Sequence, residues 1–259
     1  MKTETVILDP ARPDVTLTSY ILPGCRPAML VLPGGGFYAL ASHEGDPFAI
    51  HFMAEGFNAF VLNYSIGKPE SGFPRPLTDV SAAIVHIREN AEKYCIDPDR
   101  LFVIGSSAGG YLAGAIAAMW HCDFAKSSPD MEYGANRPNG VILTYAVVST
   151  REDIRCFCFD NLVTEEYGEE AVSLERYVDE KSVPAFIWHS FPDECVDPRN
   201  ALVLADAYVR AKVPFELHLY PDGTHGIGLG DPEKYPRSSR WTYEAAAWAR
   251  GLCTDGDRK

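Results

Sequence analysis

The segment Gly105-Ser106-Ser107-Ala108-Gly109 constrains this chain more than any other feature. It fits the pattern G-x-S-x-G. A short apolar run (100–104) precedes it, and a run rich in good helix formers (111–120) follows it. A buried strand, a sharp turn and a helix form the context in which this pattern exposes a nucleophilic serine. The segment therefore predicts that the hydroxyl of Ser107 stands clear of the end of a strand. A strand–glycine–helix turn without catalysis is the alternative.

Length and composition restrict the class of protein. The chain has 259 residues, of which 46% are hydrophobic and 23% charged, as in a globular chain that forms one large α/β domain or two small ones. A formal net charge of −13 predicts repulsion from phosphate backbones and anionic lipid heads, so we expect neither a nucleic-acid nor a membrane partner. The seven cysteines are odd in number and include no C-x-x-C pair, which favours buried free thiols over disulfides or a zinc site.

The sequence also carries expectations about location. Its first five residues lead into no apolar segment of the kind that signal peptides contain. No apolar run approaches the roughly 18 residues of a membrane-spanning helix. We therefore expect a cytoplasmic protein, with a lost leader as the alternative. Nothing in the sequence decides whether the chain forms a homo-oligomer.

Strand-like and helix-like runs alternate without a repeat or linker, so we expect one domain over residues 1–259. The strands are expected at 6–8, 15–21, 28–32, 58–64, 100–104, 140–145, 184–189 and 214–220, and the helices at 48–55, from 76 to 91, 111–120, 199–211 and 238–252. This alternation predicts an α/β fold with a mostly parallel sheet, helices on both faces and an opening antiparallel pair. Residues 97–99 are expected to form a turn. Residues 150–182 are polar and irregular, which suggests at most a small cap.

Ser107 needs a base, because a serine hydroxyl is a poor nucleophile at neutral pH. In folds with this serine turn the acid and the histidine follow the serine in that order along the chain. His225 follows the last expected strand directly, between glycines that allow the loop to swing toward Ser107. We predict that His225 is the base. A loop histidine that only caps backbone carbonyls is the alternative.

The carboxylate should follow the preceding strand, where three acidic residues occur. Asp193 is the predicted partner of the histidine, and Glu194 is the substitute. Asp197 precedes a proline and is typical of a helix cap. His189 ends the strand and is interpreted as a structural residue or as a support for the site.

The developing oxyanion needs two convergent N–H groups. One should come from Ala108, at the start of the helix after Ser107. The other should come from Gly35 or Gly36, in a glycine run directly after a buried strand, and the sequence does not choose between them. Weaker candidates for substrate contacts are Phe37, Tyr38, Phe191 and Ser106, together with Tyr64; each of the aromatic residues fits a hydrophobic core equally well.

With these residues the chain resembles the α/β-hydrolase fold, and within it bacterial esterases similar to acetyl-xylan esterase and other carbohydrate deacetylases. The resemblance covers nearly the whole chain and rests on residues 32–37, 42–45, 59–64, 97–100, 105–110, 186–190, 219–220 and 223–226. It implies hydrolysis of small esters, commonly acetyl groups on sugars, with no metal and no cofactor. Carried over by motif, the catalytic residues are Ser107, Asp193 and His225. Residues 150–182 match the family least.

The sequence thus predicts a serine hydrolase that cleaves short-chain esters through an acyl-enzyme, with a small-molecule ester, such as an acetylated sugar, as its partner. Two other functions remain open at this point. A peptidase or amidase would use the same three residues, and usually adds a domain that restricts access. A non-catalytic binding protein would keep the fold but tolerate the loss of catalytic residues.

Overall fold

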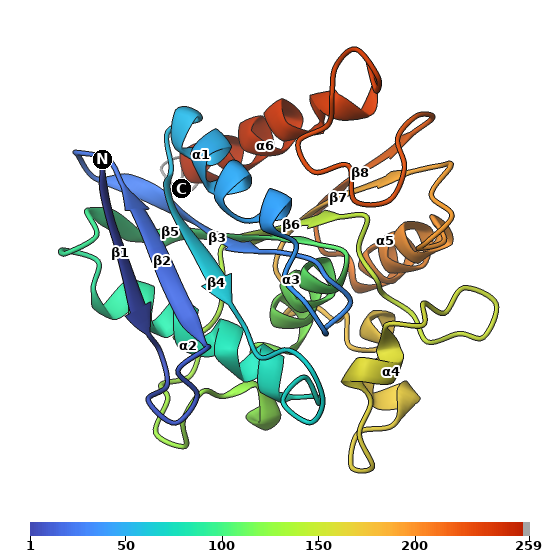
Figure 1. Cartoon of the computed structure of the whole chain (residues 1–259), viewed down its shortest axis with the longest axis horizontal. Helices are drawn as coiled ribbons and strands as arrows, with labels where there is room; N and C mark the ends of the chain where they lie inside the picture. Colours follow the sequence, from blue (N-terminus) through green and yellow to red (C-terminus); the bar gives the residue numbers. More distant parts are fainter. Residues whose placement is uncertain (256–259) are drawn as a thin grey trace.

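The computed structural model describes residues 1–255, which contain one sheet in the order β1-β2-β4-β3-β5-β6-β7-β8 (Figure 1). The strands are β1 Lys2–Ile7, β2 Thr16–Ile21, β3 Arg26–Leu32, β4 Asn58–Asn63, β5 Ile96–Ser106, β6 Gly140–Thr144, β7 Ala185–Ser190 and β8 Phe215–Tyr220. Strand β2 pairs antiparallel with β1 and β4, and every pair from β4 to β8 is parallel. The expected mostly parallel α/β sheet with its antiparallel opening is confirmed.

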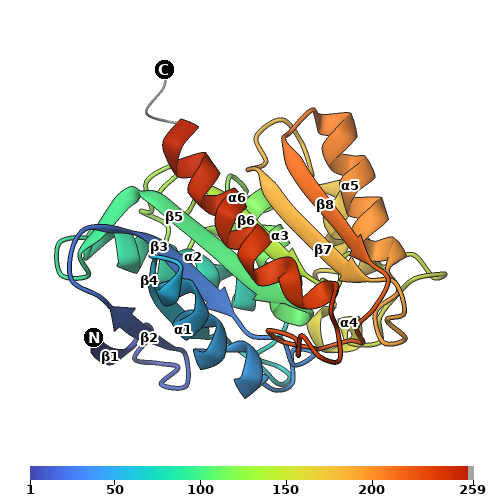
Figure 2. The same ribbon diagram turned by 90° about the horizontal axis from the view of Figure 1, so that it is seen from above.

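Helices cover both faces of this sheet. They are α1 Asp46–Ala54, α2 Arg75–Glu89, α3 Ala108–Met119, α4 Phe159–Leu162, α5 Arg199–Ala211 and α6 Trp241–Asp255. Figure 2 shows α1 and α6 on one face and α2 and α3 on the other, where α5 also packs. Successive residues of β5 alternate between the two cores, because strand side chains point to opposite faces: Val103 joins one hydrophobic cluster, and Phe102 and Ile104 join the other.

Two local expectations need correction. Residues 97–99 do not form a separate turn but belong to β5, where the register with β3 slips between Arg26 and Ala28. The extra residues form an irregularity within the strand, so the strand begins earlier than its apolar run. The expected burial of the cysteines is also wrong in part. Cys25, Cys95 and Cys195 are exposed, whereas Cys156 and Cys158 are buried.

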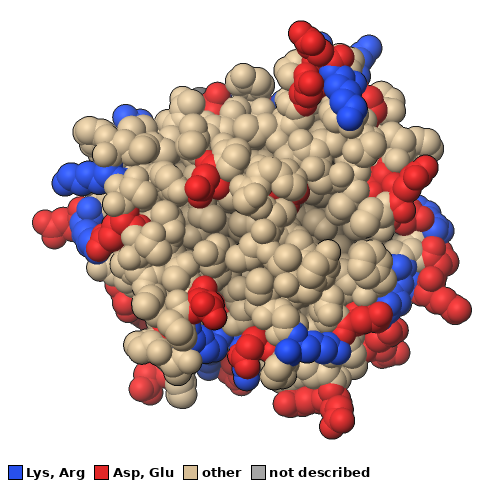
Figure 3. All heavy atoms as spheres, in the orientation of Figure 1, with Lys and Arg blue, Asp and Glu red and all other residues tan. Residues whose placement is uncertain are grey.

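The surface is consistent with the acidic composition. In Figure 3 charged side chains lie mainly around the rim of the face shown, and lysines and arginines do not gather at its middle. This face therefore has no basic patch of the kind that binds nucleic acid. Within residues 1–255 no helix combines the length and the apolar character needed to cross a bilayer.

Candidate active site

Ser107 occupies a strained turn between β5 and α3. Its φ of 53° and ψ of −115° are values that residues with a side chain rarely adopt. The crossing of strand and helix leaves no room for larger neighbours: a Cβ on Gly105 would lie 2.0 Å from the carbonyl oxygen of Gly109, and one on Gly109 would lie 2.1 Å from that of Leu32. Both glycines are therefore required by close backbone approach, as the sequence pattern predicts.

Ser107, His225 and Asp193 form one hydrogen-bonded row. Nε2 of His225 lies 2.9 Å from Oγ of Ser107, and Nδ1 lies 2.7 Å from Oδ2 of Asp193. A carboxylate only accepts hydrogen bonds, so Nδ1 carries the ring proton and Nε2 presents its lone pair to the serine hydroxyl. This tautomer is the one that can take up the serine proton. The three residues follow β5, β7 and β8, whose carboxyl ends share one edge of the sheet.

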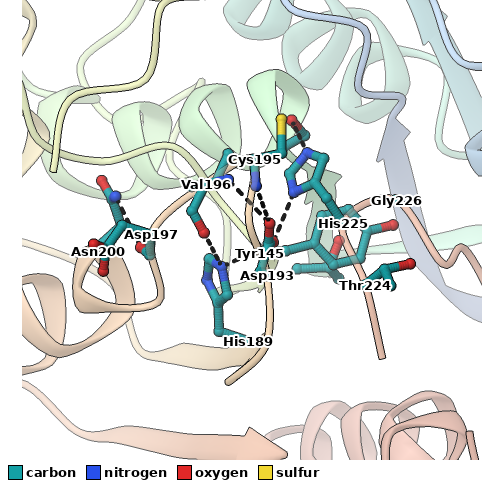
Figure 4. Close-up of polar contacts among 12 residues, drawn as sticks. Tyr145, His189, Asp193, Cys195, Val196, Asp197, Asn200, Thr224, His225 and Gly226 are labelled. Carbon is teal, nitrogen blue, oxygen red and sulfur yellow. Dashed lines mark hydrogen bonds and ion pairs between the residues drawn. The ribbon is translucent and has the colours of Figure 1, made fainter. Parts of the chain in front are cut away.

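Asp193 also accepts hydrogen bonds from residues other than His225 (Figure 4). Its Oδ1 accepts the backbone N–H groups of Cys195 at 2.9 Å and Val196 at 3.0 Å. Nε2 of the fully buried His189 lies 3.1 Å from Oδ2 of Asp193 and 2.9 Å from the carbonyl oxygen of Val196. Because that carbonyl can only accept, Nε2 of His189 bears the proton and donates to both oxygens. His189 therefore supports the carboxylate, as interpreted from the sequence.

These contacts determine the charge of Asp193. Burial by itself would raise the pKa of this carboxyl group. The hydrogen bonds from His189 and His225, the charge of His225 and the N–H of Val196 act in the opposite direction, and the pKa lies well below its usual range. Asp193 is therefore ionised at neutral pH, and its carboxylate accepts the hydrogen bond from Nδ1 of His225.

The other acidic residues of this loop have different positions. Oδ1 of Asp197 accepts the backbone N–H of Arg199, the first residue of α5, at 2.8 Å, but the N-cap position is Pro198, so the expected cap lies one residue too early. Among residues 1–255, Glu194 makes no hydrogen bond to His225. Neither residue competes with Asp193 for the histidine.

Three backbone N–H groups, two in the glycine run after β3 and one directly after Ser107, have no acceptor within residues 1–255. The carbonyl oxygen of Gly35 accepts from the N–H of Tyr38, and the carbonyl oxygen of Gly36 accepts from Nδ2 of Asn161 at 2.9 Å. No described residue accepts a hydrogen bond from the N–H of Gly35, Gly36 or Ala108. Ala108 is the first residue of α3, where an N–H has no acceptor within the helix. The N–H of Ala108 is therefore free to donate a hydrogen bond at the end of β5.

The structure contradicts two of the substrate-contact candidates. Phe37 is fully buried, and its ring packs edge-on against Tyr111 at 5.8 Å. Ser106 is also fully buried, and its Oγ accepts a hydrogen bond from the hydroxyl of Thr144 at 2.7 Å. Ser106 is the last residue of β5, and its side chain points into the core on one face of the sheet rather than toward a ligand.

The remaining aromatic candidates differ in exposure. Tyr38 is 62% exposed and Phe191 is 67% exposed, whereas Tyr64 is buried and donates its hydroxyl proton to the carbonyl oxygen of Pro33.

A cavity of about 350 Å³ opens beside Asp193, between residues 152–155 and the loop that carries the carboxylate. Among residues 1–255, no cluster of histidine, cysteine and acidic side chains has a geometry that could hold a metal ion.

Sequence reasoning gave no role to a buried carboxylate behind the glycine run. Glu44 is 2% exposed; its Oε2 accepts the N–H of Gly34 at 2.8 Å, and its Oε1 accepts the hydroxyl proton of Tyr145 at 2.6 Å. The ring of Tyr145 stands edge-on to that of His225 at 5.1 Å. The only sequence signal for Glu44 was its place in the family motif, because only the fold brings it back to Gly34.

Comparison with known proteins identifies the family of the chain. The family model described as BD-FAE matches residues 22–148. The acetyl ester-xyloside bifunctional hydrolase from Caldicellulosiruptor lactoaceticus is 30% identical, with a TM-score of 0.82 over 96% of each chain. The chain belongs to the α/β-hydrolase family of esterases.

Other relatives are similar to most of this chain. The endo-1,4-beta-xylanase B of Butyrivibrio fibrisolvens is 37% identical over 216 residues, or 80% of this chain and 33% of that protein. The acetylxylan esterase of Xylanibacter ruminicola is 30% identical over 221 residues, or 80% of this chain and 42% of that protein. A carboxylesterase from Lactobacillus plantarum has a TM-score of 0.83 at 26% identity, over 97% of this chain and 98% of that one. The chain thus spans less than half the length of these first two relatives.

Proposed function

We propose that the protein hydrolyses short-chain esters, most of all acetyl groups on carbohydrates, through an acyl-enzyme formed on Ser107. The observation that carries this proposal is the row of Ser107, His225 and Asp193 beside unpaired backbone N–H groups. The relatives named acetylxylan esterase and acetyl ester-xyloside hydrolase support the choice of an acetylated sugar.

The reaction has two halves. Oγ of Ser107 attacks the ester carbonyl carbon while Nε2 of His225 takes the hydroxyl proton, and Asp193 orients the ring and stabilises its positive charge. The tetrahedral oxyanion accepts hydrogen bonds from the N–H of Ala108 and from Gly35 or Gly36. His225 then protonates the leaving alkoxide as the C–O bond breaks. Water attacks the acyl group with the help of the same base and releases the acid and Ser107.

Residues 150–182 act in this proposal as a small cap on a single domain of residues 1–259. The cap packs directly on the glycine loop: Asn161 binds the carbonyl oxygen of Gly36, and Cβ of Cys158 lies 3.6 Å from the place where a Cβ on Gly36 would stand. Such close packing leaves little space for a long acyl chain and favours acetate. The exposed rings of Tyr38 and Phe191 offer faces on which a sugar can stack.

The test is hydrolysis of p-nitrophenyl acetate by Ser107→Ala, with circular dichroism to show that the fold persists. Ser107→Ala should lose turnover, and the matched control Ser106→Ala, which removes the buried hydroxyl next to it, should keep it. Retained turnover in Ser107→Ala would refute the proposed nucleophile. A series of acyl lengths and acetylated xylo-oligosaccharides tests the substrate. Faster cleavage of an aminoacyl anilide than of acetate would favour a peptidase instead.

A further inference from the structure

The short helical turn of residues 42–44 contacts two loops that the proposed reaction needs. It precedes α1 and places the side chain of Glu44 beneath the glycine loop. Nε2 of His43, on the same turn, lies 3.0 Å from the carbonyl oxygen of Gly226, in the loop of His225. One turn thus lies between the glycine loop and the histidine loop.

The first contact of Glu44 is with the glycine loop. Its Oε2 accepts the N–H of Gly34, the residue before the proposed oxyanion donors. Gly34 itself lies against the nucleophile turn: a Cβ added there would stand 2.6 Å from Oε2 of Glu44, 2.9 Å from the carbonyl oxygen of Ser106 and 3.1 Å from Cβ of Ser107. A shift of Gly34 would therefore move the donors relative to the serine.

The second contact leads to the histidine. Tyr145 donates its hydroxyl proton to Oε1 of Glu44 and accepts the N–H of Gly228 at 3.3 Å. Its fully buried ring packs against both His225 and Trp188 at 5.1 Å. Burial and then the neighbouring carboxylate raise the pKa of Tyr145 well above its usual value, so the phenol keeps the proton that it donates.

We propose that Glu44 is a positioning residue for ester hydrolysis, which fixes the oxyanion donors through Gly34 and the ring of His225 through Tyr145. This inference rests on the proposed function. A carboxylate suits the task because it accepts two hydrogen bonds on two oxygens. Glutamine at the same place would turn one oxygen into a donor, which would then face either the N–H of Gly34 or the hydroxyl of Tyr145.

The experiment measures kcat and KM for p-nitrophenyl acetate in Glu44→Gln, Tyr145→Phe and the double variant. Glu44→Gln should lower kcat about 100-fold, the order of loss that a small misplacement of reacting groups produces. KM should stay within about 3-fold, because the ground-state contacts are unchanged. Tyr145→Phe, which keeps the ring, should lower kcat about 10-fold, and the double variant should fall no further than Glu44→Gln, because both changes break one network.

Asp79→Asn is the matched control. Asp79 is a carboxylate as buried as Glu44, at 1% exposure, and it accepts the N–H of Ser65 at 2.9 Å and pairs with Arg12 at 2.7 Å. A general loss of stability would appear in Asp79→Asn as well, whereas kcat per active site should not change. The amplitude of labelling by a fluorophosphonate counts the folded active sites in each variant.

The outcomes separate this inference from the proposed function. A folded Glu44→Gln with kcat near that of the wild type overturns the positioning role. Should Glu44→Gln fail to fold, Tyr145→Phe decides, and unchanged kcat in that variant overturns it equally. Turnover that survives Ser107→Ala refutes the proposed function itself, whatever Glu44→Gln does.

Discussion

Replacing Asp193 by asparagine should remove most of the turnover by fixing His225 in the wrong tautomer. The two backbone N–H groups at 2.9 and 3.0 Å from Oδ1 require an acceptor there, whereas Nε2 of His189 near Oδ2 also has the carbonyl oxygen of Val196, so the asparagine oxygen takes the place of Oδ1. Its amide NH₂ group then faces Nδ1 of His225, which lies 2.7 Å from the present Oδ2. Because the amide donates, Nδ1 must accept, and the ring proton moves to Nε2, where it blocks uptake of the proton of Ser107.

The size of the loss of kcat in Asp193→Asn follows from the catalytic groups that the variant keeps. The oxyanion donors and substrate binding are untouched, so the variant should keep the part of the rate enhancement that they supply. A serine hydrolase whose histidine is held in the wrong tautomer loses about 10⁴-fold in kcat. That factor corresponds to about 5.5 kcal/mol of transition-state stabilisation. KM should change little, because Asp193 contacts His225 rather than the ester.

The assay is steady-state hydrolysis of p-nitrophenyl acetate by Asp193→Asn, corrected for spontaneous hydrolysis. Glu194→Gln is the matched control: it removes the neighbouring carboxylate, which makes no hydrogen bond to His225 within the described chain, and should retain its activity. A loss of about 100-fold or less in Asp193→Asn would show that this carboxylate does not set the tautomer, since a small misplacement of the reacting groups alone is expected to cost that much.

Three further predictions concern stability. Ser107→Gly should raise the free energy of unfolding by about 1 kcal/mol over Ser107→Ala, because glycine adopts a φ of 53° without strain; equal urea midpoints would mean that the turn is not strained. Gly109→Ala should lower it by about 3 kcal/mol, since the new Cβ would stand 2.1 Å from a carbonyl oxygen of β3; wild-type thermal stability would contradict this. The pKa of Asp193 lies below its unfolded value of about 3.9, so its contribution is complete above that pH and is lost as pH falls toward the folded pKa. Stability should therefore fall less steeply in acid in Asp193→Asn than in the wild type, and equal slopes of urea midpoint against pH would argue against the shift.

The positions of the site residues could be predicted from the sequence because the loops that follow parallel strands meet at one edge of the sheet. Each of Ser107, Asp193 and His225 lies in the turn or loop that follows a strand, and parallel strands end at one edge of a sheet. The alternation of strand-like and helix-like runs in the sequence was therefore enough to predict that three distant side chains lie together. The cap of residues 150–182 has no such period, and only the structure shows that Asn161 reaches the glycine loop.

Side-chain direction was the part that sequence could not supply. Phe37 and Ser106 adjoin proposed catalytic groups in the chain, yet both point into the core, because successive residues of a strand or tight loop face opposite ways. Glu44 presents the converse case. It lies ten residues from Gly34 in the sequence, and its partner Tyr145 lies 101 residues away, so no local pattern links the three.

Most of the non-glycine residues with a strained backbone lie at the site, and packing in the two hydrophobic clusters stabilises their conformations. Five non-glycine residues within 1–255 have positive φ; one is Ser107, and two others, Phe37 at 63° and Tyr145 at 38°, adjoin the glycine loop and the histidine. Such conformations cost about 1–3 kcal/mol each and persist only where packing enforces them. Phe37 is fully buried in the hydrophobic cluster on the α3 face, and Tyr145 is fully buried in the cluster on the α6 face. A fully buried ring contributes about 1.5–3 kcal/mol, enough to offset the strain of its own residue. Because each strained residue depends on a different face of the sheet, loss of packing on either face should distort the site before the molecule unfolds.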